Sequence, residues 1–124
     1  MKYFVLSAVL FFFASSFMTL SFDEVVKAIK AGDASEVSKY FDNTVEITLA
    51  TKSNSYGRTQ AAQVLHDFFA SNAVKDFEIL HKSDNAGSQY CIGNLKTVNG
   101  IFRTTIFMKQ KGSTEVIQSL SFEK

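Results

Sequence analysis

The sequence contains no proline, no tryptophan and a single cysteine among its 124 residues. Cys91 has no second cysteine to pair with, so the sequence excludes an internal disulfide as a support for the fold. Its place between Tyr90 and Ile92, in the middle of a predicted strand, favours a small buried hydrophobe over a catalytic thiol. The 13 basic and 12 acidic residues give a formal charge of +1, which offers no electrostatic footprint for nucleic acid.

Motifs for several chemistries are also absent from the sequence. It has no glycine-rich phosphate loop and no Gly-x-Ser-x-Gly elbow. The two histidines, His66 and His81, follow none of the spacings that are typical of zinc sites. The sequence therefore predicts no metal, no cofactor and no assigned catalytic residue.

The first 21 residues read as a cleaved signal peptide. Lys2 gives a positive start, residues 3–14 are almost uninterruptedly apolar, and small residues follow at 14–16 with a second exit at Ser21. A retained anchor is the alternative, because a membrane span needs about 20 apolar residues. The serines and the small-residue exit favour cleavage. We expect an exported protein, periplasmic or secreted, with no stable membrane anchor after cleavage.

Residues 22–124 are predicted to form one domain that begins with three helices. Phe22–Ala31 has apolar residues at helical spacing, and Gly32 ends it. A second helix opens at Asp33, with Glu36 completing a capping box and its apolar face reaching Phe41. The third helix covers residues 59–72. Between the second and third we expect a strand over residues 43–51, then a polar loop with at most a short strand at Tyr56.

Four strands are predicted to follow without interruption, from residue 74 to residue 122. Polar and apolar residues alternate with the period of a half-buried strand over 74–83, 88–98, 101–111 and 114–122. The break at Asn99-Gly100 predicts a hairpin with a type I′ turn. Helices followed by hairpin-joined strands indicate an α+β domain: three N-terminal helices packed on a curved antiparallel sheet.

This order of elements resembles the cone-shaped fold of nuclear transport factor 2-like (cystatin-like) proteins. More narrowly, the chain resembles a family of short exported bacterial proteins of unknown function. The residues that carry the resemblance are Phe41-Asp42, Val45, Ile47, Gln60-Ala61, Val64-Leu65, Phe68-Phe69, Phe77, His81, Tyr90, Ile92-Gly93, Leu95 and Phe102-Arg103. The resemblance implies a fold but no activity, because the wider fold hosts enzymes, ligand carriers and dimerisation modules.

Alternation along the strands predicts a candidate pocket inside the cone. The inner face is expected to carry His81, Tyr90, Thr104 and Gln118 among Phe and Ile residues, with Tyr56 at the mouth and no Asp or Glu. Apolar cavities with a few convergent polar groups are typical ligand sites. The leading hypothesis is therefore a non-catalytic domain that binds a small apolar or amphipathic ligand, or a peptide, inside the cone.

Two alternatives stay open. A histidine beside a tyrosine is able to act in proton transfer, so an isomerase- or dehydratase-like enzyme would use His81 and Tyr90. A cone filled by phenylalanines would instead favour a structural dimerisation or partner-binding module.

The outer face is expected to carry an apolar patch that forms a homodimer, because exported monomers seldom leave such a patch open. The alternative is a monomer on which these apolar residues are scattered, as is normal on a protein surface. The candidate interface residues are Leu80, Leu95, Arg103, Phe107 and Ile117.

Overall fold

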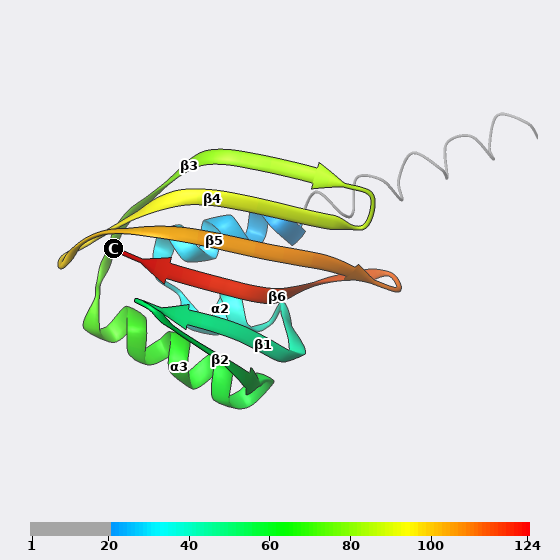
Figure 1. Ribbon diagram of the computed structural model, residues 1–124, viewed down its shortest axis with the longest axis horizontal. Coiled ribbons are helices and arrows are strands. Elements are labelled where there is room, and N and C mark those ends of the chain that lie inside the picture. Colours follow the sequence, from blue (N-terminus) through cyan, green and yellow to red (C-terminus); the bar gives the residue numbers. More distant parts are fainter. Residues whose placement is uncertain (1–20) are drawn as a thin grey trace, which may run out of the picture.

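The computed structural model describes residues 21–124 (Figure 1). The predicted leader, apart from Ser21, lies outside the described residues. Residues 21–31 are helical, and the elements that follow are α2 (Ala34–Ser38), β1 (Phe41–Leu49), β2 (Lys52–Gly57), α3 (Arg58–Ser71), β3 (Val74–Asn85), β4 (Ser88–Thr97), β5 (Gly100–Lys111) and β6 (Thr114–Glu123).

The first two helices begin where the sequence predicted, but the second helix, α2, ends earlier than predicted. Gly32 takes a φ of +66°, which a glycine adopts without strain, and stops the first helix. Asp33 caps α2, because its carboxylate accepts the Glu36 backbone N–H at 3.1 Å. The predicted continuation of this helix to Phe41 is wrong. The Tyr40 carbonyl accepts the backbone N–H of Ile117 instead, and Phe41 starts β1.

The six strands form one sheet in the order β2-β1-β6-β5-β4-β3 (Figure 1). The predicted α+β class, with helices at the N-terminal end and a curved sheet, is confirmed. The sheet is mixed and not antiparallel throughout, because β1 pairs with β6 in parallel. A parallel pair needs a long connection, and here β2, α3 and three further strands lie between the two partners. β2 forms a full edge strand where a polar loop was expected, since its exposed residues show no apolar alternation.

The hairpin between β4 and β5 differs in detail from the predicted type I′ turn. Thr97 and Gly100 pair across it, and Gly100 has a φ of +109° while Asn99 has no positive φ. A type I′ turn requires positive φ at both central residues. The Thr97 hydroxyl accepts the Asn99 N–H at 3.1 Å and donates to the Gly100 carbonyl at 2.8 Å, which stabilises this different turn.

Two irregularities in strand register decide which residues face the helices. The β3–β4 pairing shifts between Ile79 and His81, and the β5–β6 pairing shifts at Phe107/Met108, where Gln118 is the extra residue. Each extra residue reverses the alternation beyond it. On β4 the prediction was wrong by one position, since Cys91 and Leu95 are fully buried and Tyr90 is only half-buried.

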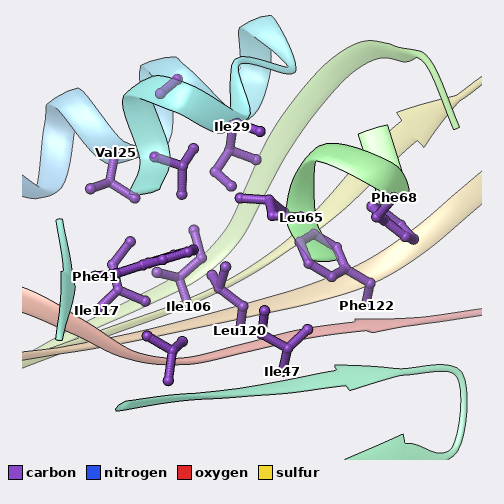
Figure 2. Close-up of a cluster of buried hydrophobic side chains, with 14 of the residues drawn as sticks. Val25, Ile29, Phe41, Ile47, Leu65, Phe68, Ile106, Ile117, Leu120 and Phe122 are labelled. Carbon is purple, nitrogen blue, oxygen red and sulfur yellow. The ribbon is translucent and has the colours of Figure 1, made fainter. Parts of the chain in front are cut away.

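The helices pack on the inner face of the sheet and fill the cone with apolar side chains (Figure 2). Val25 and Ile29 from the first helix and Leu65 from α3 point toward strand residues such as Ile106. Phe68 of α3 stacks on Phe122 with ring centroids 4.4 Å apart. Burying one such ring contributes roughly 1.5–3 kcal/mol to folding. The aromatic packing therefore holds α3 against the sheet.

Candidate functional site

The five residues predicted to line a pocket inside the cone do not converge. His81 and Tyr90 lie together, with ring centroids 6.4 Å apart, but both are on the outer face of the sheet. Tyr90 sits in one cross-strand row with Ser83 and Phe107, and His81 is exposed and pairs with Ile92. The register shift before His81 moved it to the opposite face from Phe77. The geometry thus separates the histidine and tyrosine from the interior.

The other three predicted pocket residues occupy separate places. Thr104 is fully buried, and its hydroxyl donates to the Phe102 carbonyl at 3.2 Å. Gln118 lies at the irregularity of β6, where its amide donates to Asp42 at 3.2 Å. Tyr56, on edge strand β2, is half-buried and packs against the core.

Aromatic rings occupy the interior where the pocket was expected. Besides stacking on Phe122, the Phe68 ring meets Phe102 edge-on at 5.2 Å and Phe69 at 5.9 Å. Phe22 and Phe41 are each 1% exposed. This packing corresponds to the filled cone that the sequence left open as an alternative.

Two of the five residues predicted for the outer face are in the core. Leu95 pairs with Phe77 on one side and Phe102 on the other, and it is fully buried. Ile117 is fully buried beside Met108. The placement of both was wrong because the β4 alternation was read one residue out and the extra residue in β6 was missed. Leu80, Arg103 and Phe107 do lie away from the core, with Leu80 51% exposed.

The centre of the outer face carries an uncharged group of half-buried side chains that we call the outer-face patch. Its members form adjacent cross-strand rows on β4, β5 and β6: Tyr90, Ile92, Thr105, Phe107, Ser119 and Ser121. Exposed Leu80 and His81 on β3 border it. The sequence pointed to Phe107 but not to Tyr90 or Ile92 as members.

A buried carboxylate at the start of β1 joins three elements. The Asp42 carboxylate accepts three hydrogen bonds: from Lys111 Nζ at 2.9 Å, from the backbone N–H of the next residue, Asn43, at 2.8 Å, and from the Gln118 side-chain amide at 3.2 Å. The hydrogen bond from Lys111, followed by that from Asn43, lowers the pKa of Asp42. The sequence singled out Asp42 only as one of the residues that carry the family resemblance. In the structure, Asp42 links β1 to the β5–β6 hairpin through these hydrogen bonds.

A second acidic residue, Glu115, lines a pocket of about 370 Å³ at the end of the molecule where the β5–β6 hairpin turns. We call it the hairpin-end pocket; its lining residues are Ser21, Lys39, Tyr40, Phe41, Arg58, Ser113, Thr114, Glu115 and Val116. Glu115 is 6% exposed. Burial, together with the nearby Asp84 carboxylate, raises the pKa of Glu115.

The expectation that the inner strand faces carry no acid was therefore wrong. Glu115 lies two residues from buried Ile117 and shares its face, but the extra residue Gln118 reversed the predicted alternation there. A bulge leaves no clear mark in a single sequence, so no signal was available to find this residue.

Cys91 is fully buried, as the sequence suggested, and it lies on the inner face of β4. Burial raises the pKa of its thiol to about 11, which leaves it protonated near neutral pH. Within residues 21–124, no three or more His, Cys, Asp or Glu side chains gather as a metal site would require. Among the helices of that range, none combines the length and apolarity that a membrane crossing requires.

The sequence matches a known protein family. The model of a domain of unknown function, DUF4783, matches residues 22–123. The chain belongs to the DUF4783 family. Comparison with functionally curated proteins found no match.

Solved structures agree with this membership. A DUF4783 protein from Bacteroides ovatus is 30% identical, with 82% of this chain and 92% of that chain covered and a TM-score of 0.79. One from Bacteroides fragilis is 32% identical, with coverage of 82% and 95% and a TM-score of 0.78. An NTF2-like protein of unknown function from Cytophaga hutchinsonii is 9% identical over 82% and 84%, with a TM-score of 0.59, and shows the fold alone. This DUF4783 domain thus has the nuclear transport factor 2-like fold that its sequence suggested.

Proposed function

We propose that this DUF4783 domain is an exported, non-catalytic module that associates with a second copy of itself through the outer-face patch. The observation that carries the proposal is the composition of the patch, with Tyr90, Ile92 and Phe107 at its centre and no charged member. Interface cores are depleted in charged residues and enriched in aromatic ones.

A second copy suits this patch better than a charged partner does. An isologous dimer places the same surface on both sides, so a patch of one charge sign would repel itself. Serine and threonine side chains surround the apolar centre here, and they are able to hydrogen-bond to their own copies. Charged side chains lie only at the border of the patch: Glu46 on β1 is the register partner of Ser119, and Arg103 and Glu123 are register partners of each other at one end of the face.

Packing inside the cone supports this choice over the two rival functions. A ligand inside the cone needs open space between α3 and the sheet, where Phe68 and Phe122 stack at 4.4 Å. Proton transfer by His81 and Tyr90 needs an enclosed site, whereas His81 is exposed. Both residues lie at the outer-face patch, where they would contribute contacts and not chemistry.

Sedimentation equilibrium at low micromolar concentration tests the proposal. The wild-type chain should sediment as a dimer, and Phe107→Asp should weaken the dimer about 30-fold or more, because it buries a charge at the interface centre. Ser35→Asp, at an exposed position on α2, is the matched control and should leave the dimer unchanged. Far-UV circular dichroism confirms that both variants fold. A wild-type chain that stays monomeric, or a Phe107→Asp chain that dimerises normally, contradicts the proposal.

A further inference from the structure

Glu115 has an unsatisfied carboxylate oxygen in the interior of the hairpin end. Within the described part of the chain, its Oε1 atom is buried and has no hydrogen-bond partner. Gln89 Oε1, on the same inner face of β4, is also buried without a partner there. Both atoms are acceptors that no donor of the described residues reaches. An isolated buried carboxylate is costly unless a cation or several donors reach it.

Cations near the pocket are engaged elsewhere. Lys39 binds Glu36 at 2.7 Å, and Arg58 donates to Asn43 at 3.0 Å. Lys111, in the same hairpin as Glu115, binds Asp42 at 2.9 Å. Asp84 adds a second negative charge near Glu115. Within residues 21–124, Glu115 therefore has no positively charged partner.

The residues that line the pocket limit which chemical group is able to pair with the Glu115 carboxylate. A metal ion would need more oxygen or nitrogen ligands than this pocket offers, since no group of three His, Cys, Asp or Glu occurs in residues 21–124. A primary ammonium has three donors and needs few acceptors. Phe41, Tyr40 and Val116 provide apolar or aromatic walls for the carbon atoms attached to it.

We propose that the hairpin-end pocket binds an α-ammonium group, with the Glu115 carboxylate as its acceptor. This chemistry has two sources. One is a free ligand, an amino acid or the amino terminus of a peptide. The other is the chain itself, because Ser21 lines the same pocket and removal of the predicted leader would create a new amino terminus beside it.

The test uses the chain as its host exports it, with the mature amino terminus read from the intact mass. Phenylalaninamide is the probe, because it carries an α-ammonium and an apolar side chain. N-acetylphenylalaninamide, which lacks the ammonium, is the matched control ligand. Binding is followed through the amide NMR signals of Thr114 and Val116. Glu115→Gln removes the charge, and Glu123→Gln, an exposed acid on β6, is the control variant.

If the source is a free ligand, phenylalaninamide shifts these signals and N-acetylphenylalaninamide does not. Glu115→Gln should then weaken the affinity about tenfold or more, and Glu123→Gln should leave it within about twofold. If the source is the mature amino terminus, added amine does not bind. In that case, acetylating the α-amino group lowers the melting temperature of the wild type but not of Glu115→Gln.

The proposal is overturned if neither ligand binds and acetylation changes nothing. Glu115→Gln as stable as the wild type, or more stable, would agree with that result, because an empty site gains from losing a buried charge. Should Glu115→Gln fail to fold, the comparison of the two ligands and the acetylation of the wild type still decide the question.

Discussion

Replacing Gly93 with alanine should destabilise this domain more than any other single-methyl addition that its glycines allow. A methyl group on Gly93 would lie 2.6 Å from the Glu78 carbonyl oxygen and 2.6 Å from Phe77 Cε1. The Phe77 ring is itself buried, and the Glu78 oxygen belongs to the backbone of β3 directly opposite. Neither group is able to move away without disturbing the β3–β4 pairing or the core.

The expected cost follows from overpacking. Added methyl groups in well-packed cores typically cost about 1–3 kcal/mol. Because one of the clashing atoms is backbone, we expect the upper end, about 3 kcal/mol. Each kcal/mol lowers the melting temperature by roughly 4–8 °C in a domain of this size, so the shift should be roughly 12 to 24 °C. Gly93 has no positive φ, so the loss is steric and not a matter of backbone strain.

Thermal and urea unfolding followed by circular dichroism measure this effect. Gly57→Ala is the matched control, because its added methyl meets nothing within 4 Å and its φ is −65°. It should cost less than about 1 kcal/mol, the scale of a changed helix N-cap. A Gly93→Ala chain within about 0.5 kcal/mol of the wild type would show that β3 and β4 do not approach as closely as described.

Two further predictions concern the aromatic core and the hydrogen bonds of Asp42. Phe68→Ala should cost about 3–5 kcal/mol in urea unfolding, since it removes a ring that stacks on Phe122, whereas His66→Ala on the exposed side of α3 should cost under about 0.5 kcal/mol; equal losses would contradict the filled cone. Asp42→Asn should cost about 1 kcal/mol at pH 7, because the half-exposed Lys111 limits the strength of the pair. The folded-state pKa of Asp42 is lowered, so its stabilisation is present above the ordinary carboxyl pKa of about 3.9 and is lost as the pH falls through the folded value. Unfolding of both chains at pH 7 and pH 2.5 should therefore show a smaller difference at pH 2.5; the same difference at both values would refute the role of the charge.

Local sequence signals predicted those parts of the fold that depend on neighbouring residues. The Asp33 cap, the stop at Gly32 and the breaks after the first and third predicted strands, which contain Gly87 and Gly112, are where the sequence placed them. The period of two located β3 to β6 to within two residues. These features could be predicted because a cap, a positive φ or an alternation is decided within a few residues.

The candidate sites depended on features with no such local signal. An extra residue on β3 before His81 moved that histidine to the outer face, and Gln118 on β6 brought Glu115 and Ile117 inside. The side-chain period of two turns a one-residue error into a change of face. Of the predicted pocket, only the contact between His81 and Tyr90 survived, and it lies outside the cone.

By itself, the sequence determined the order of helices and strands and the α+β class, because hydrophobic periodicity and turn residues act over short distances. Only the tertiary structure decided that β1 lies parallel to β6, that phenylalanines fill the cone, and that Glu115 is buried beside Ser21. Those outcomes depend on pairing between segments far apart in the chain, where bulges and packing choose one register among several that the same alternation permits.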